Sequence, residues 1–289
     1  WFDEKDLNYD SHILQNHQKH PKGNELIKKY MERDYVVPKN FAHLIYVNQL
    51  LQAEGIATGI EAHRRAKPYC MGSLYWQLND CWPSISWSGI DYEGRWKALQ
   101  YFAKKSFEPI ILSLERNDNL LNIYMVNDKD EWIVGYLNMQ MFNLNGRKIL
   151  EAQEYCKIKP DSKEILKSID ITQYNFTDLN NLFLNIRFDG NEHISQKNFY
   201  FVKPKDLSLF KPEIKISIEK EEDHFLIVLL SDVLAKNVFV DCSVNGKYSD
   251  NYFDLIPGEE KAIEFYPDKD IESISFTTFS LWDTLRKKN

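Results

Sequence analysis

Residues 72–99 read GSLYWQLNDCWPSISWSGIDYEGRWKAL and hold four of the seven tryptophans of the chain. The apolar run at residues 71–76, which overlaps the start of this stretch, predicts a buried strand. Polar Asn79 and Asp80 follow, then a loop with proline, serine and glycine, and then a helical pattern from Arg95. A strand, a polar and aromatic loop and a helix in this order are typical of a (β/α)-barrel, whose site lies at the carboxyl ends of its strands.

The side chains of this loop suit a sugar. The C–H face of a sugar ring stacks on an aromatic ring, and amide or carboxylate groups bond its hydroxyls. Trp76, Asn79, Asp80 and Trp82 are therefore the candidate substrate-binding residues. The alternative for Asn79 and Asp80 is that they hold the loop through backbone bonds, as Asn and Asp often do. For Trp82 the alternative is packing within the loop.

Composition excludes several classes of protein. The 289 residues leave room for two or three domains, and 43% hydrophobic residues are enough for ordinary cores. No apolar run reaches about 18 residues, so we expect no membrane span. The net charge of −7 comes without a dominant basic patch, which argues against a nucleic-acid partner.

The cysteines and histidines do not indicate a metal site. Four cysteines lie far apart and lack metal-ligand spacing, and we interpret them as buried free thiols; they are Cys70, Cys81, Cys156 and Cys242. The seven histidines show no ligand pattern. We therefore expect neither a metal nor another cofactor.

After Pro109 the apolar period changes from helical to two. Residues 121–125 and 137–141 alternate apolar and polar side chains, and the Asn145-Gly146 pair is a strong hairpin signal. A second alternating pattern begins at Ile214. Short strands and turns at this spacing predict two antiparallel sandwiches of immunoglobulin-like size.

The stretch at residues 75–99 also carries a resemblance. YWQLNDCWP at 75–83, followed by SWS at 86–88 and GRWKAL at 94–99, resembles the last barrel strand and helix of the β-mannosidases, which belong to the family 2 glycoside hydrolases. Similar segments further upstream extend the match to about residues 10–108, roughly a third of the chain.

The resemblance implies a mixed fold. Residues 1–108 would be the C-terminal part of a (β/α)8 TIM-barrel catalytic domain, with its last strand and helices. Residues 109–205 and 206–289 would be two antiparallel immunoglobulin-like β-sandwich domains. One barrel strand cannot close a barrel, so the first segment should expose an apolar face and self-associate through it.

The resemblance also implies a function. The chain would be the C-terminal fragment of a retaining, exo-acting β-mannosidase, which hydrolyses terminal β-D-mannosyl residues of an oligosaccharide or glycoconjugate. Trp76 would form the floor of the subsite for the mannosyl ring, and Trp82 would line the leaving-group side.

Retaining hydrolysis needs two carboxylates, and the resemblance implies that both lie elsewhere. The family nucleophile belongs to a Ser-Glu-Phe-Gly motif, which does not occur in these residues, so it is expected upstream of Trp1. Glu25 and Glu192 follow Gly-Asn pairs, but we interpret Glu25 as part of a helix start and Glu192 as part of a hairpin turn. We assign no catalytic residue and expect the chain alone to be inactive.

Two other interpretations stay open. One is a relative in the same family, a β-galactosidase or β-glucuronidase, although the string after Trp76 favours a mannosidase. The other is a non-catalytic module, a carbohydrate-binding or scaffolding protein built from the two sandwiches. Solvent-facing aromatic residues on one sheet would indicate sugar binding; the candidates are Tyr124, Trp132, Tyr136 and Phe142.

Overall fold

The computed structural model describes residues 2–8, 11–174, 178–191 and 193–285. These form two compact units. The first unit contains the described residues of Trp1–Gly55, Tyr75–Phe102 and Leu209–Asn289, and the second contains Ile56–Leu74 and Ala103–Ser208.

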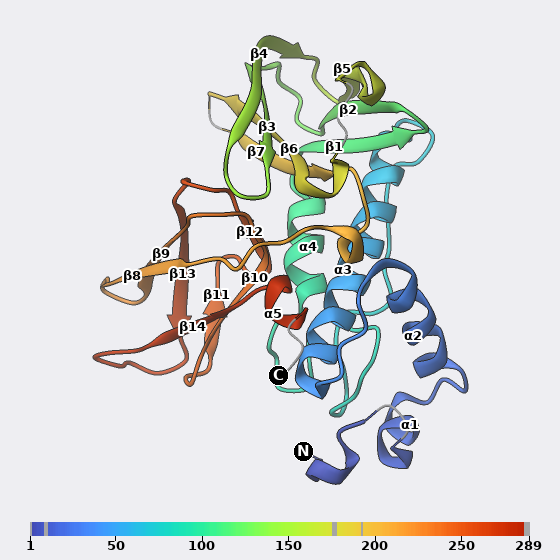
Figure 1. Ribbon diagram of the computed structural model, residues 1–289, viewed down its shortest axis with the longest axis vertical. Coiled ribbons are helices and arrows are strands. Elements are labelled where there is room, and N and C mark those ends of the chain that lie inside the picture. Colours follow the sequence, from blue (N-terminus) through green and yellow to red (C-terminus); the bar gives the residue numbers. More distant parts are fainter. Residues whose placement is uncertain (1, 9–10, 175–177, 192, 286–289) are drawn as a thin grey trace. The chain divides into compact units, whose positions relative to one another are not determined.

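Helices dominate the first third of the chain (Figure 1). They are η1 (Glu4–Asp6), α1 (His12–Gln18), α2 (Gly23–Asp34), α3 (Phe41–Arg65) and α4 (Ala98–Ser106). Asn40 caps α3, because its side-chain oxygen accepts a bond of 3.1 Å from the backbone N–H of His43. Val47, Leu50 and Ala53 recur at helical spacing on α3 and are fully buried, which places an apolar stripe of this helix in the core.

Residues 71–76 do not form the predicted strand. Leu74 is fully exposed, and Met71 is 68% exposed. A strand is stable only when neighbouring backbone satisfies its N–H and C=O groups, and no described strand pairs with this segment. The helix after the loop begins at Ala98, slightly later than the pattern from Arg95 predicted.

The second unit is a sandwich of two antiparallel sheets. Three strands pair in the order β1-β2-β5, and four pair in the order β4-β3-β6-β7. Leu137, Met139 and Ile186 point inward from the four-stranded sheet into a core shared with Leu121 and Ile123 of β2. The strands are β1 (Ile110–Asn117), β2 (Leu120–Asn127), β3 (Ile133–Asn143), β4 (Lys148–Ile158), β5 (Ser162–Asp170), β6 (Leu182–Gly190) and β7 (Ile194–Tyr200).

Local sequence fixes the β3–β4 hairpin, as predicted. Gly146 has a φ of 93°, a conformation that glycine adopts without steric cost. The side chain of Asn143 accepts a bond of 2.7 Å from the backbone N–H of Arg147, which closes the turn. Short 3-10 helices connect later parts of the chain; they are η2 (Ile171–Tyr174), η3 (Leu179–Asn181) and η4 (Pro204–Asp206).

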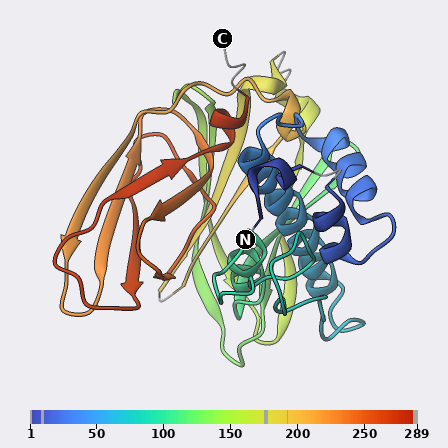
Figure 2. The same cartoon turned by 90° about the horizontal axis from the view of Figure 1, so that it is seen from below.

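The carboxyl-terminal strands form a second sandwich, inside the first unit (Figure 2). Its sheets have the orders β11-β13-β9-β8 and β12-β10-β14, and every pair of strands is antiparallel. Ile227, Val240 and Phe265 are fully buried between them. The elements are β8 (Ile214–Lys220), β9 (Phe225–Ser231), β10 (Ala235–Cys242), β11 (Gly246–Tyr248), β12 (Phe253–Leu255), β13 (Lys261–Pro267), β14 (Phe276–Phe279) and α5 (Leu281–Thr284).

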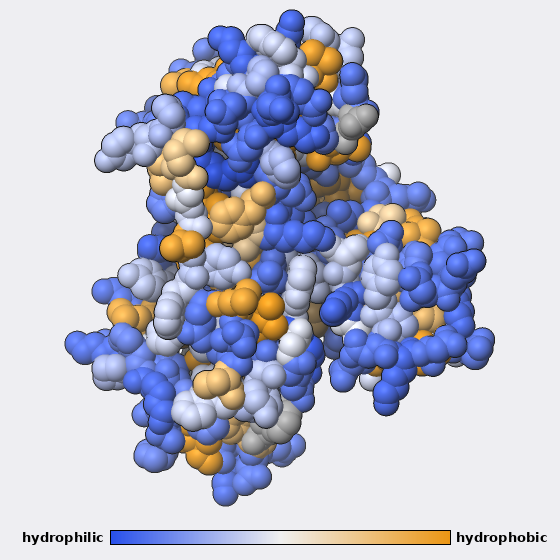
Figure 3. Space-filling view, turned by 180° about the vertical axis from the view of Figure 1, so that it is seen from behind, coloured by the Kyte–Doolittle hydropathy of each residue, from blue (hydrophilic) through white to orange (hydrophobic). Residues whose placement is uncertain are grey.

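The two sandwiches confirm the predicted β architecture after Pro109. The barrel origin of residues 1–108 and the boundaries after residues 108 and 205 stay predictions. Hydrophilic residues cover most of the face in Figure 3, and hydrophobic residues appear on it as separate groups. Among the described helices, none is long and apolar enough to cross a membrane.

Candidate functional site

The loop after residue 76 is organised around the buried carboxylate of Asp80. Its Oδ2 accepts bonds from the Ser88 hydroxyl at 2.6 Å and from Lys97 Nζ at 2.7 Å, and its Oδ1 accepts from the Ser86 hydroxyl. Lys97 Nζ also donates to the Ser88 hydroxyl at 2.6 Å. The side chains of Asp80 and Lys97 are only 4% and 13% exposed. The buried pair therefore ties three separate parts of the loop together.

Backbone bonds complete this framework. The N–H of Asp80 donates to the Ile90 carbonyl at 3.1 Å, and the N–H of Ile90 donates to the Leu78 carbonyl at 2.8 Å. The N–H of Lys97 donates to the carbonyl of Gly89 at 2.9 Å. The loop thus satisfies part of its own backbone polar groups internally.

The four predicted site residues do not converge on one point. Trp76 is 74% exposed and Asn79 is exposed, so both lie at the surface. Asp80 is turned inward, and its carboxylate is occupied by the network described above. Trp82 is 39% exposed, and its indole N–H donates to the carbonyl of His17 at 3.1 Å.

The amino-terminal segment meets this loop at Trp82. The rings of His17 and Trp82 are 5.3 Å apart, and Lys19 Nζ lies 5.3 Å from the centre of the Trp82 ring. His17 Nδ1 lies 2.8 Å from the carbonyl oxygen of Pro83. His17 lies in the last turn of the short helix α1, which ends at Gln18, and Lys19 follows the helix. Gln18 is buried.

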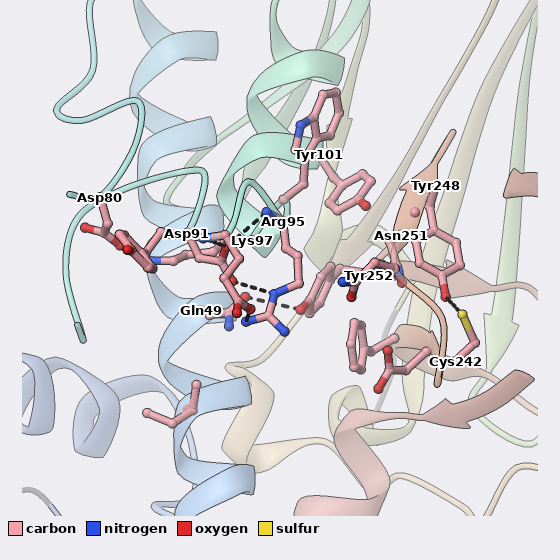
Figure 4. A pocket seen from close by; sticks show the side chains of 18 of the residues that line it. Gln49, Asp80, Asp91, Arg95, Lys97, Tyr101, Cys242, Tyr248, Asn251 and Tyr252 are labelled. Carbon is pink, nitrogen blue, oxygen red and sulfur yellow. Dashed lines mark hydrogen bonds and ion pairs between the residues drawn. The ribbon is translucent and has the colours of Figure 1, made fainter. Parts of the chain in front are cut away.

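A hollow of about 580 Å³ opens beside the loop within the first unit. Pro83 is among the lining residues, and Tyr248, Asn251 and Tyr252 lie across the hollow from Asp80 (Figure 4). The Tyr252 hydroxyl donates to the side-chain oxygen of Gln49 at 3.2 Å. Burial raises the pKa of both Tyr248 and Tyr252, so these hydroxyls stay protonated at neutral pH.

An exposed ion pair lies at the edge of this hollow. Arg95 Nε lies 2.8 Å from Asp91 Oδ2, and its terminal nitrogen lies 2.6 Å from Glu93 Oε2. Both partners of Arg95 are carboxylates of its own loop. Gln49, Tyr248 and Tyr252 were missed, because no spacing in the sequence links them to the tryptophan loop.

Glu25, the other carboxylate of the sequence analysis that the structure describes, does not line this hollow. Glu25 is exposed in the first turn of α2, where the helix N-terminus favours a negative charge. Glu192 lies outside the described residues. Among the described residues, no group of three or more His, Cys, Asp or Glu side chains is placed to hold a metal ion.

Family models match both sandwiches. Residues 119–206 match a mannosidase Ig/CBM-like domain, and residues 209–284 match an Ig-fold domain. Beta-mannosidase A of Emericella nidulans is 30% identical over 286 residues, which cover 88% of this chain and 30% of that protein. Beta-mannosidase of Rattus norvegicus is 28% identical over 91% of this chain and 33% of its own length. The chain thus spans about a third of the curated relatives it matches.

Two solved structures also resemble this chain. The crystal structure of Beta-D-Mannosidase from Dictyoglomus thermophilum matches with a TM-score of 0.87 and 26% identity, covering 96% of this chain and 35% of that one. The exo-chitosanase CsxA of Amycolatopsis orientalis matches with a TM-score of 0.76 at 16% identity, covering 96% of this chain and 40% of that one. The second likeness shows a shared fold alone.

Proposed function

We propose that this chain, which resembles the C-terminal part of a family 2 glycoside hydrolase of the β-mannosidase kind, supplies one wall of the substrate site in a retaining, exo-acting β-mannosidase. The proposed substrate is a terminal β-D-mannosyl residue of an oligosaccharide or glycoconjugate. The relatives named above support the enzyme class. The exposed indole of Trp76 supports the position that we propose for this wall.

Trp76 carries this proposal. Its indole is 74% exposed, and the loop that follows it is anchored by the buried pair of Asp80 and Lys97. A large exposed aromatic side chain on a fixed support is what a sugar ring needs for stacking. Covering it with a mannosyl ring would bury apolar surface that is now in water, and the fixed loop would limit the entropy lost on binding.

Asp80 has a positioning role in this proposal. Its carboxylate already accepts bonds from Lys97, Ser86 and Ser88, so it holds the loop instead of touching the sugar. Asn79 is exposed beside it, and its amide could bond a sugar hydroxyl. Trp82 would form the leaving-group side, where His17 and Lys19 pack against it.

Bond cleavage in this proposal is performed by two carboxylates outside these 289 residues. Retention requires a nucleophile and a general acid/base about 5–5.5 Å apart. The nucleophile forms the covalent glycosyl intermediate, and the acid first protonates the leaving oxygen and then activates water. This chemistry uses neither a metal nor an organic cofactor.

Hydrolysis of 4-nitrophenyl glycosides tests the proposal. The protein extended upstream and the present chain are assayed side by side on the β-mannoside, β-galactoside and β-glucuronide. We expect turnover of the β-mannoside by the extended protein alone. Turnover by the present chain would contradict the placement of the carboxylates, and activity on another sugar alone would contradict the substrate.

The role of Trp76 is tested in the extended protein. Trp76→Ala should lower kcat/KM for the β-mannoside by roughly 10- to 100-fold, which corresponds to the loss of one buried aromatic contact. Tyr30→Ala is the matched control, because Tyr30 is an exposed aromatic residue on α2. A Trp76→Ala enzyme with the kcat/KM of the parent would remove Trp76 from the site.

The proposal includes self-association of the present chain. Tyr69, Met71 and Leu74 lie close in sequence in the second unit and are all exposed, and exposed apolar side chains favour contact with a second copy. Sedimentation velocity of the present chain should show oligomers, and Leu74→Lys should shift the population toward monomer. A parent chain that stays monomeric at high concentration would refute this part.

A further inference from the structure

The outer face of the four-stranded sheet in the second unit carries an ordered set of side chains that the proposed function does not use. Residues on alternate positions of a strand share a face. Tyr136 of β3 lies opposite Tyr155 of β4 and Asp189 of β6. In the next row, Asn138 of β3 lies opposite Gln153 and Arg187. These residues therefore lie on one side of the sheet, away from its core.

Three aromatic side chains stand out on this face. Trp132, Tyr136 and Tyr155 are 50%, 49% and 63% exposed. The rings of Tyr136 and Tyr155 lie 5.6 Å apart at 68°, so the two rings form a corner. Lys157 Nζ lies 4.4 Å from the centre of the Trp132 ring. Of the four aromatic residues proposed from sequence, Phe142 is buried and Tyr124 is half-buried, while Tyr155 was missed.

Core packing does not explain these aromatic residues. The core of this sandwich is filled from the opposite side of the same strands, by Leu137 and Met139 of β3 and by Ile186 and Phe188 of β6. Exposed aromatic residues gathered on one sheet face are a signature of a binding surface. Exposed aromatic residues lower the solubility of the protein and add nothing to the core.

A row of hydrogen-bonded polar groups runs beside the aromatic residues. Gln153 Nε2 donates to Asn138 Oδ1 at 2.7 Å, and Asn138 Nδ2 donates to Asp189 Oδ2 at 2.7 Å. Arg187 Nε donates to Asp189 Oδ1 at 2.7 Å. These bonds fix the orientation of the amide, carboxylate and guanidinium groups. Amides have a second donor, and a guanidinium has five, so donors remain for a ligand.

From this arrangement we infer that the outer face of β4-β3-β6-β7 binds an uncharged oligosaccharide of hexose units. The ring corner of Tyr136 and Tyr155 stacks against the C–H face of one hexose, and the row of Gln153, Asn138 and Arg187 bonds its hydroxyls. The ionic groups of the face include both signs, with Lys157 and Arg187 against Glu151 and Asp189, which favours a neutral ligand over a polyanion.

Geometry also indicates a chain of sugars rather than one. Trp132 directly precedes β3 and lies four residues before Tyr136, a separation of up to about 13 Å in an extended chain. This distance exceeds one hexose ring, so only an oligosaccharide contacts both side chains. The match of residues 119–206 to a mannosidase Ig/CBM-like domain is consistent with this inference. The inference does not depend on the sugar that the proposed enzyme hydrolyses.

Calorimetric titration of the present chain with β-1,4-linked mannohexaose and cellohexaose tests the inference. We expect saturable binding of at least one hexasaccharide. Tyr136→Ala and Tyr155→Ala should each weaken binding by about tenfold, the loss of one stacked ring. Gln153→Ala should weaken it by roughly threefold to tenfold, through one neutral hydrogen bond. Tyr30→Ala, at an exposed aromatic residue outside this sheet, should bind like the parent.

Several outcomes would overturn the inference. They are an absence of binding to both hexasaccharides, full binding by the double variant of Tyr136 and Tyr155, or preferential binding of polygalacturonate. Because the substituted side chains are exposed, circular dichroism should show an unchanged fold in every variant. The extended Tyr136→Ala protein should keep its β-mannoside turnover, so failure of the binding test and failure of the proposed function remain separate results.

Discussion

Trp76 and Tyr136 are both exposed aromatic residues, but the structure around them holds them in different ways. Trp76 precedes an irregular loop, which is held by side chains that converge on the buried carboxylate of Asp80. Tyr136 stands on a regular sheet, which is held by the backbone ladders between β3, β4 and β6. The loop depends on the identity of a few side chains, whereas the sheet depends on backbone bonds that nearly any residue can make.

Removal of the Asp80 carboxylate should have the largest effect on stability. Asp80→Ala leaves the ammonium group of Lys97 buried without its partner, and breaking a buried pair in this way costs about 4 kcal/mol. Urea denaturation should therefore show a loss of roughly that size. Hydrogen exchange should accelerate in residues 77–97 more than in the sheet of the second unit.

The exposed pair of Asp91 and Arg95 provides the control for this experiment. Their side chains are 24% and 56% exposed, so solvent screens the attraction. Arg95→Ala removes this ion pair and leaves the backbone bonds that Asp91 accepts, so it should cost less than about 1 kcal/mol. Equal losses for Asp80→Ala and Arg95→Ala would show that burial of the Asp80 pair does not decide the stability of the loop.

Substitutions at two neighbouring residues of β3 should differ by nearly as much in their effect on the free energy of unfolding. Leu137 is fully buried in the core, and Leu137→Ala should destabilise the second unit by about 3 kcal/mol, because it removes apolar contacts and leaves a cavity. Tyr136→Ala, on the opposite face, should change stability by less than about 0.5 kcal/mol. Thermal unfolding of both variants compares the two faces of one strand, and a large loss for Tyr136→Ala would assign this ring to packing.

The sheets could be predicted from sequence and the loop could not, for a physical reason. Alternation in residues 137–141 and the turn at Gly146 are local signals, and they place β3 and β4 correctly. The apolar run at residues 71–76 has the same local character. Its conformation depends on a neighbouring strand, which no local pattern encodes, and this prediction was wrong.

Prediction of the site from sequence has the same limit, because local patterns do not reveal long-range contacts. The motif identified Trp76 and Asp80 as unusual, but it did not reveal that Asp80 turns inward to meet Lys97, seventeen residues later in the chain. Gln49 and Tyr252 are 203 residues apart in sequence and share a hydrogen bond beside the loop. Contacts of this kind arise from the packing of whole elements, so single-sequence patterns contain no trace of them.

The rate of thiol labelling should also differ between the loop and the sheet, although this effect is smaller. Cys81 is exposed in the loop, in contrast to the buried thiol that sequence suggested, and Cys156 is half-buried on β4. Burial raises the pKa of the Cys156 thiol, and the nearby Glu154 raises it further. A raised pKa means less thiolate at pH 8, and the thiolate is the reactive form. Cys81, which is exposed, should therefore react faster than Cys156.

Peptide mapping after timed labelling measures this difference. The Cys81→Ser variant confirms the assignment of the fast site, and a shift from pH 8 to pH 9.5 should narrow the gap as Cys156 ionises. If Cys156 instead reacts first at pH 8, the sheet opens more readily than the loop, and the comparison between them is reversed.

The smallest expected effect concerns Lys157, whose ammonium group lies over the Trp132 ring at the end of the aromatic face. Lys157→Met removes an exposed cation–π contact and should cost about 0.5 kcal/mol, measured in a double-mutant cycle with Trp132→Ala. The same substitution uncovers the indole face for a sugar ring, so hexasaccharide binding should strengthen slightly while stability falls. A variant that loses both stability and binding would show that Lys157 itself contacts the ligand, and the binding surface would then extend beyond the aromatic corner toward the start of β3.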